Sequence, residues 1–305
     1  MSNVSGGRSF SEAKDPNKIE KAFARQKPVL IAGMHRSGTS ILADILQSSG
    51  LFLGDRQIPD LQESLLFVRI NNEIFSQCFA TWNNPFGIHL ALNNPENTRG
   101  LAGFAMYNLN QNPISFLGEE LSEKYAGIEN ADFVWGWKDP RNTFTLPVWQ
   151  RIFPELKVIF IYRHGIDVAE SFYQRHIYAL SEIYPEKDVP ALVVEEDEIG
   201  LSHARRGWTR EEALTLWEEY MEKGMEYYHL NRDRFCLVQY ESLMQRPQET
   251  IAPVLEFCGL DEKKMPKDKL REINAGRCYA YLNNPELKQF AKEKRHICQR
   301  FGYEV

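Results

Sequence analysis

A glycine-rich loop between two apolar segments constrains the fold of this chain more than any other feature. The loop GMHRSGTS, residues 33–40, follows the apolar run Pro28–Ala32 and precedes residues 41–49, whose apolar side chains recur on one helical face until Gly50. This order predicts a buried strand, a loop and a helix. Because a helix start presents free N–H groups and the positive end of its dipole, the unit is typical of an anion-binding site.

The loop differs from that of a nucleoside triphosphatase at one position that matters. Gly33 and Gly38 have the spacing of the G-x-x-x-x-G-K-[ST] motif, and Ser40 ends it. Thr39 replaces the motif's lysine, however, and Arg36 brings a positive charge into the middle of the loop instead. The loop is therefore expected to bind an anion other than a nucleoside triphosphate with magnesium.

The second predicted strand ends in a cation. The run KVIFIY at residues 157–162 predicts a buried strand, Arg163 follows it directly, and Ser171 lies two turns into the next helical stretch. A triphosphatase needs an aspartate at such a strand end to hold magnesium, whereas an arginine pairs bidentately with a phosphate. The pattern favours one phosphate in the loop and another between Arg163 and Ser171, with no metal ion.

Strands alternate with helices along the chain. A third apolar run, residues 235–240, again precedes a helical pattern. Short buried strands separated by helices indicate a parallel sheet, so we expect an α/β, P-loop-like three-layer fold with a central, mainly parallel sheet flanked by helices. Further helices are expected at residues 61–80, 95–130, 167–180, 210–229 and 251–258.

The 305 residues are expected to form one domain with a tail. Residues 1–27 are polar and predict a flexible N-terminal tail with a short amphipathic patch at 19–23, while residues 28–305 predict a single domain. Within residues 175–210, the part from 184 onward is rich in proline, glycine and charge. We expect this segment to be a lid or an acceptor-binding insertion.

Net charge, apolar runs and cysteine content limit the partners and the cellular compartment that we expect for this chain. The net charge of −6 argues against general binding to nucleic acid, which needs a basic excess. No run of about 18 apolar residues occurs, so no membrane span is expected. The five cysteines are scattered and odd in number, which favours reduced thiols in the cytoplasm over disulfides or a zinc site.

Four ordered segments resemble sulfotransferases that use 3′-phosphoadenosine 5′-phosphosulfate (PAPS). In that family a loop such as PRSGT cradles the 5′-phosphosulfate, and residues 35–39 of this chain read HRSGT. A strand ending in arginine, with serine eight residues later, holds the 3′-phosphate in the family; IYRHGIDVAES at 161–171 resembles it. Residues 136–163 and 238–260 resemble the K-D-P…F-P…R and Y-E-x-L…P…L-x-F-x-G-L segments, nearest to the tyrosylprotein-type and bacterial branches.

This resemblance implies an enzyme that moves a sulfonate group from PAPS to an acceptor hydroxyl by in-line displacement, leaving adenosine 3′,5′-bisphosphate. It implies that Arg36 and Lys138 contact the transferred group. It also implies Glu63 as the catalytic base, with Asp60 and His35 as rivals. The implied donor-binding residues are His35, Arg36, Ser37, Gly38, Thr39, Ser40, Arg163, Ser171, Arg175, Tyr240 and Arg277.

Some of these residues have plainer alternatives. Lys138 is alternatively a surface lysine beside a proline turn, Glu63 a solvated carboxylate at a helix start, and Arg175 a solvated arginine. Trp135 and Trp137 either stack on the adenine or belong to the core.

Two other functions stay open on the sequence alone. One is a P-loop nucleotide kinase or triphosphatase with a degenerate loop, which metal-dependent ATP turnover would reveal. The other is a non-catalytic nucleotide-binding module, which would bind the donor without transfer. The acceptor is expected to be a small molecule, a glycan or a peptide that bears a hydroxyl. The sequence leaves its identity and the oligomeric state open.

Overall fold

The structure is a computed structural model that describes residues 16–183 and 206–304. Residues 1–15 and the part of the expected insertion from 184 to 205 lie outside the described residues.

A four-stranded parallel sheet forms the centre, with the strand order β4–β1–β5–β6. Its strands are β1 (Val29–Ala32), β4 (Gly136–Lys138), β5 (Lys157–Tyr162) and β6 (Phe235–Gln239). The three predicted strands are confirmed, with the third ending one residue early. Strand β4 was not expected, because its three residues, Gly-Trp-Lys, carry no β-branched run.

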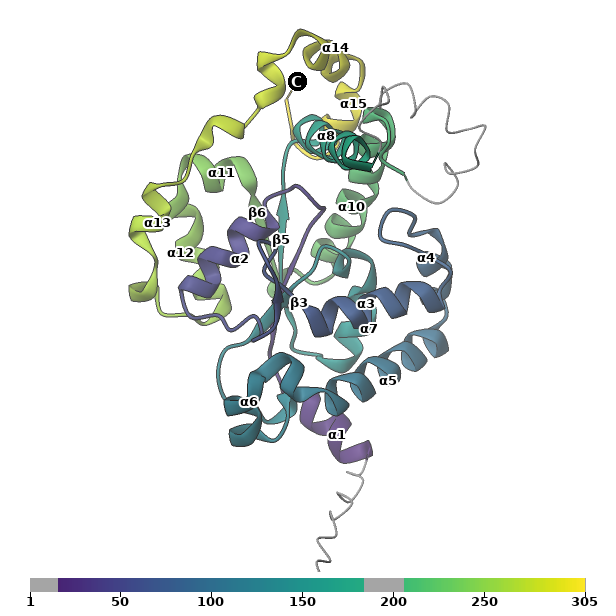
Figure 1. Cartoon of the computed structure of the whole chain (residues 1–305), viewed down its shortest axis with the longest axis vertical. Coiled ribbons are helices and arrows are strands. Elements are labelled where there is room, and N and C mark those ends of the chain that lie inside the picture. Colours follow the sequence, from purple (N-terminus) through teal and green to yellow (C-terminus); the bar gives the residue numbers. More distant parts are fainter. Residues whose placement is uncertain (1–15, 184–205, 305) are drawn as a thin grey trace, which may run out of the picture.

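Helices cover both faces of the sheet, so the predicted α/β three-layer architecture is confirmed. Figure 1 shows α2, α11 and α12 on one side of the strands and α3, α7 and α10 on the other. The helices are α1 (Pro16–Phe23), α2 (Thr39–Ser48), α3 (Leu65–Gln77), α4 (Phe86–Leu92), α5 (Pro95–Gln111), α6 (Pro113–Tyr125), α7 (Asn142–Ile152), α8 (Gly165–Ile183), α10 (Arg210–Leu230), α11 (Tyr240–Gln245), α12 (Pro247–Cys258), α13 (Lys267–Arg271), α14 (Pro285–Glu293) and α15 (Arg295–Gln299).

Successive side chains of β1 enter different cores. Val29 and Ile31 pack with apolar residues of α2, α11 and α12, whereas Leu30 and Ala32 join the larger cluster that includes α3, α7 and α10. This alternation follows from the period of two along a strand. Because both faces are buried, β1 reads as a continuous apolar run rather than an alternating one.

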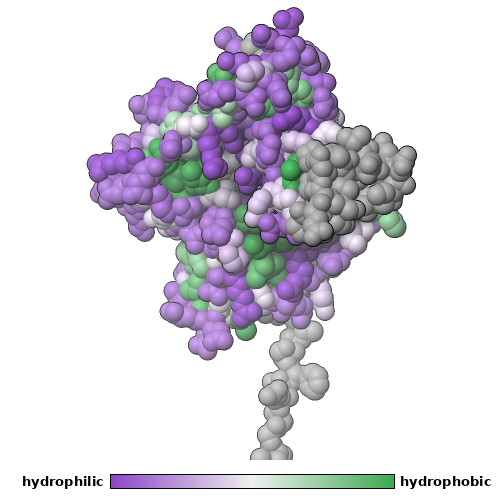
Figure 2. Space-filling model, turned by 45° about the horizontal axis from the view of Figure 1, so that its top comes forward, coloured by the Kyte–Doolittle hydropathy of each residue, from purple (hydrophilic) through white to green (hydrophobic). Residues whose placement is uncertain are grey.

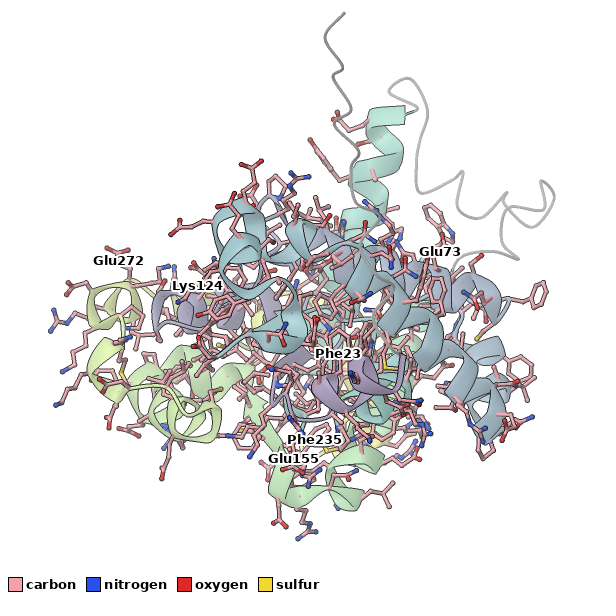
Figure 3. All side chains as sticks on the ribbon, turned by 90° about the horizontal axis from the view of Figure 1, so that it is seen from below. Phe23, Glu73, Lys124, Glu155, Phe235 and Glu272 are labelled. Carbon is pink, nitrogen blue, oxygen red and sulfur yellow. The ribbon has the colours of Figure 1, made fainter. Side chains whose placement is uncertain are left out.

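Residues 16–27 are more ordered than predicted. Residues 16–23 form α1, on which Figure 3 labels Phe23. The Phe23 side chain is completely buried and packs edge-on to Phe153, with ring centroids 5.8 Å apart. Gln26 Nε2 donates to the carbonyl of Glu129 at 2.9 Å, and Trp135 Nε1 donates to Gln26 Oε1 at 3.0 Å. The prediction of a flexible tail is therefore wrong for residues 16–27, where the amphipathic patch packs on the core.

The predicted helix at 61–80 also begins later than expected. A small antiparallel hairpin, β2 (Gln57–Ile58) and β3 (Glu63–Ser64), precedes α3. Glu63 therefore lies on a strand and is only 3% exposed, so it is not a solvated carboxylate at a helix start.

Within residues 16–183 and 206–304, no helix is long and apolar enough to span a membrane. Hydrophilic residues dominate the face shown in Figure 2.

A buried histidine lies at the junction of β5 and α8. His164 is fully buried, and its ring stacks on that of Tyr281 with centroids 4.6 Å apart. Its Nδ1 accepts from the backbone N–H of Ile166 at 3.3 Å, and its own backbone N–H donates to Glu241 Oε1 at 2.9 Å. Burial, and secondarily the charge of Arg163, lowers the pKa of His164 to about 4.

We predict that this histidine makes stability depend on pH. The unfolded chain binds a proton at His164 below its ordinary pKa of 6.5, whereas the folded chain does so only below about 4. The free energy of unfolding should therefore rise by about 3 kcal/mol as the pH rises through this window. His164→Asn keeps an acceptor for the Ile166 N–H but does not titrate. Urea denaturation at several pH values should show that the variant lacks this rise; an equal rise in both proteins would contradict the assignment.

Candidate functional site

A cavity of about 620 Å³ lies where the carboxyl ends of the four strands meet. Parallel strands place these ends at one edge of the sheet, so residues distant in the sequence converge there. The predicted residues that line it are His35, Arg36, Gly38, Thr39, Ser40, Glu63, Lys138, Arg163, Ser171, Arg175, Tyr240 and Arg277. Ser37 and Asp60 are not among the lining residues, and Ser37 is buried beneath the loop.

The loop after β1 adopts a conformation that its glycines permit. Gly38 has a φ of 95°, and a Cβ there would lie 2.5 Å from the ring of Tyr240. Gly33, with a φ of 138°, would place a Cβ 2.2 Å from the carbonyl oxygen of Ile161. Arg36 takes a φ of 70°, which is unusual for a residue with a side chain. The loop is thus pressed against β5 and α11, and α2 starts directly behind it.

An ionic cluster forms the floor of one end of the cavity. Lys138 Nζ donates to Glu63 Oε1 at 2.8 Å, to the carbonyl of Leu61 at 2.9 Å and to Ser40 Oγ at 3.2 Å. Arg141 Nη2 donates to the other oxygen, Glu63 Oε2, at 2.9 Å. The Lys138 and Glu63 side chains are only 2% and 4% exposed. Lys138 is therefore not a surface lysine.

Burial shifts both members of this pair toward their neutral forms. It raises the pKa of the Glu63 carboxyl, aided by the nearby charge of Asp139 and opposed by Lys138 and Arg141. Burial likewise lowers the pKa of Lys138, opposed by the charge of Glu63. Glu63 is the first of the charges that oppose the shift in Lys138, and Lys138 and Arg141 together oppose the shift in Glu63.

Arginines gather at the other end of the cavity. Arg36 Nε donates to Ser171 Oγ at 2.9 Å, and Arg163 Nη1 donates to the Arg36 carbonyl at 3.4 Å. Arg163 also donates to the carbonyl of Arg277 at 2.6 Å, and its guanidinium lies 4.6 Å above the ring of Tyr240. The sequence spacing that paired Arg163 with Ser171 therefore does bring them to one place.

These arginines have few counter-charges. Arg163 pairs with Asp167 at 3.4 Å, but within residues 16–183 and 206–304 no carboxylate pairs with Arg36, Arg175 or Arg277. Burial lowers the pKa of Arg36, and the charges of Arg175, Arg277 and Arg163 lower it further. Mutually repelling guanidinium groups around a cavity are a site for a multiply charged anion.

The described part of the lining carries six cationic side chains against a single carboxylate, that of Glu63. Arg163 Nε is buried without a hydrogen-bond partner among the described residues, so the cluster has donor capacity left for a phosphate. No cluster of three or more potential metal-ligating side chains occurs in the part of the chain that the structure describes.

His35 stands apart from both groups of charges. Its ring contacts that of Trp82 with centroids 4.4 Å apart. Burial lowers the pKa of His35 well below its usual range, and the cations Arg141, Lys138, Arg175 and Arg36 lower it further. Its imidazole is therefore neutral near pH 7.

Two features of the site were not predicted. Arg141 pairs with Asp139 at 2.8 Å and also holds Glu63. Its position in the Lys-Asp-Pro-Arg segment was the available signal. Trp82 lines the cavity from the turn after α3, where nothing in the local sequence marks it. Trp135 and Trp137 are buried in the core; neither lines the cavity, so the suggestion that they stack on an adenine is wrong.

Comparison with known proteins gives one family. Residues 28–264 match the family described as the sulfotransferase family. No curated protein matches the chain.

Several solved structures are similar at low identity. The sulfotransferase domain of the Synechococcus PCC 7002 olefin synthase is 16% identical, covers 92% of this chain and 96% of its own, and has a TM-score of 0.45. The sulfotransferase domain from the curacin biosynthetic pathway is 16% identical over 92% and 98%, with a TM-score of 0.48. The sulfotransferase from Alicyclobacillus acidocaldarius is 14% identical over 92% and 97%, with a TM-score of 0.49.

We predict strong coupling between Glu63 and Lys138 in stability. Glu63→Leu leaves Lys138 buried without its counter-charge, and removing one partner of a buried pair typically destabilises by about 3–5 kcal/mol. Lys138→Met should cost a similar amount. The double variant removes both charges and should lose clearly less stability than the sum of the single variants. Urea denaturation of the four proteins measures this, and additive losses would show that the pair does not couple.

Proposed function

The chain belongs to the sulfotransferase family, and from that premise we propose that it transfers a sulfonate group from PAPS to an acceptor hydroxyl. The observation that carries this proposal is the cavity with its two cationic ends. Lys138 lies at one end beside Ser40 of the loop, and Arg163 lies with Ser171 at the other, where Arg36 of the loop donates to Ser171. PAPS carries a negatively charged phosphosulfate at one end and a negatively charged 3′-phosphate at the other, so each of these groups can pair with one cationic end of the cavity.

The reaction is a displacement at sulfur. The acceptor oxygen forms a bond to sulfur while the bond between sulfur and the bridging phosphate oxygen breaks. The electron pair leaves with adenosine 3′,5′-bisphosphate, and the acceptor proton goes to a base. Arg36, Lys138 and the N–H groups at the start of α2 would stabilise the charge that develops on the bridging oxygen. This chemistry needs no metal ion.

Glu63 is the base that we propose. It lines the cavity beside Lys138, and burial raises the pKa of its carboxyl toward the working pH, which suits a proton acceptor. Asp60 does not line the cavity. His35 does, but its lowered pKa makes it the weaker base.

The other donor contacts follow from the same geometry. We assign Arg163, Ser171, Arg175 and Arg277 to the 3′-phosphate, and the loop 35–40 to the phosphosulfate. The ring of Tyr240 packs against the guanidinium group of Arg163. A triphosphatase or nucleotide kinase is not favoured, because Arg163 stands where such an enzyme needs an aspartate for magnesium.

The setting is also part of the proposal. We place the enzyme in the cytoplasm, which the free cysteines Cys78, Cys236, Cys258, Cys278 and Cys298 support. We treat residues 28–305 as one catalytic domain.

One prediction from this proposed function concerns donor recognition. Adenosine 3′,5′-bisphosphate should bind at least about tenfold more tightly than AMP or ATP, because only its 3′-phosphate meets Arg163 and its neighbours. Calorimetry with a chelator present should give the same affinity as with magnesium. Arg163→Ala should remove most of the preference over AMP. Equal affinity for AMP, or an absolute need for magnesium, would refute the donor assignment.

The second prediction separates chemistry from binding. Lys138→Ala should lower kcat at saturating donor by about a hundredfold or more, because its interaction strengthens as the sulfur–oxygen bond breaks. Arg163→Ala should chiefly raise the KM for the donor. Lys124→Ala, an exposed lysine on α6 away from the cavity, is the matched control. Steady-state kinetics decide the matter: normal kcat in a folded Lys138→Ala protein would mean that Lys138 does not contact the sulfonate.

A further inference from the structure

A chain of aromatic rings runs along one wall of the cavity. His35 contacts Trp82 at 4.4 Å between centroids, and Trp82 contacts Phe172 edge-on at 5.6 Å. Phe172 contacts His176 at 4.5 Å, and His176 contacts Trp208 at 5.0 Å. All five residues line the cavity, although they come from the loop, the turn after α3, α8 and the segment before α10. Distant parts of the sequence thus build one continuous surface.

Aliphatic side chains line the same cavity near the proposed reaction centre. Ile58 and Leu61 of the β2–β3 hairpin and Val68 of α3 line the cavity and are half-buried. The carbonyl of Leu61 accepts a hydrogen bond from Lys138 Nζ at 2.9 Å, and Glu63 lies two residues further on. The apolar wall therefore ends at the group that we assign to the sulfonate.

Apart from His35 Nε2 and Trp208 Nε1, which are buried without a hydrogen-bond partner among the described residues, the wall offers few groups to a polar ligand. Glu63 is the one carboxylate among the described lining residues, and each of its oxygens already accepts from a cation, at 2.8 and 2.9 Å, so its remaining lone pairs suit one hydroxyl rather than several. His176 Nδ1 lies 3.0 Å from the carbonyl of Phe172, within its own helix. Arg175 and Arg277, which pair with no carboxylate among the described residues, are assigned to the 3′-phosphate.

We propose that the acceptor is an alcohol with an apolar body, aryl or alkyl, whose hydroxyl reaches Glu63 while its body lies on the wall formed by Ile58, Leu61, Val68, Trp82 and Trp208. This inference rests on the proposed function and names its acceptor class. Burying an apolar body on such a wall is favourable by about 25 cal/mol per Å².

Two other acceptor classes fit less well. A sugar brings several hydroxyls, and each one buried without a partner costs free energy. An amine is cationic at neutral pH and would meet a cavity whose described lining already carries a cationic excess.

A series of primary alcohols tests the proposal. With PAPS as donor, kcat/KM should rise about fourfold for each added methylene from ethanol to hexanol, because each buried methylene contributes about 0.8 kcal/mol. Benzyl alcohol should also be a far better acceptor than methyl glucoside, whose primary hydroxyl is comparable.

Variants locate the effect on the wall. Trp82→Ala, and the milder Val68→Ser in case the first does not fold, should flatten the rise with chain length while leaving the affinity for adenosine 3′,5′-bisphosphate unchanged. Phe86→Ala truncates a 68%-exposed aromatic residue of α4 that does not line the cavity, and should behave like the wild type.

The possible outcomes distinguish an error in the acceptor class from an error in the donor assignment. A kcat/KM that does not rise with chain length, or a preference for methyl glucoside, would overturn the acceptor class while leaving the sulfotransferase intact. Binding of adenosine 3′,5′-bisphosphate without transfer to any alcohol of the series would overturn it as well. Failure to bind adenosine 3′,5′-bisphosphate would instead refute the donor assignment.

Discussion

The buried ion pair between Lys138 and Glu63 is the interaction on which the site depends. It joins β4 of the central sheet to the β2–β3 hairpin, two elements separated by more than 70 residues in the chain. Removing a charge from water costs several kcal/mol, so Lys138 depends on Glu63 as its counter-charge, and Glu63 depends on Lys138 and Arg141. Arg141 and Asp139 extend the cluster, and Asn71 of α3 donates to Asp139 at 2.7 Å. One set of charges thus fixes the hairpin, α3 and the cavity floor together.

The sequence predicted the parts of the fold and site that depend on local patterns. The strand, loop and helix at residues 28–50, the apolar runs of β5 and β6, and the spacing from Arg163 to Ser171 are all readable within about 20 residues. Their meeting at one cavity follows from a single rule, that parallel strands end at the same edge of a sheet. The loop and Arg163 could therefore be named from local patterns, whereas Lys138, Glu63 and Arg277 were named from the resemblance to sulfotransferases.

The features that could not be predicted depend on contacts between distant segments. Helix α1 spans eight residues, too short to be stable alone, and forms because Phe23 enters the core. The start of α3 was misplaced because Glu63, which looks like a residue of a first helical turn, is held in a hairpin by Lys138. Trp82 gains its role only where the turn after α3 meets the loop and α8.

Net charge says little about such a site, since the chain carries −6 overall while the described lining of its cavity is strongly cationic. Burial and the charges of Arg175, Arg277 and Arg163 lower the pKa of Arg36, and Asp167, which pairs with Arg163, is the buried carboxylate that offsets part of this repulsion among the described residues. A bound polyanion would relieve that repulsion. Stability and affinity are therefore opposed here: a carboxylate placed among Arg36, Arg175 and Arg277 would stabilise the fold and weaken the site, because it would satisfy in advance the charges that recognise the donor.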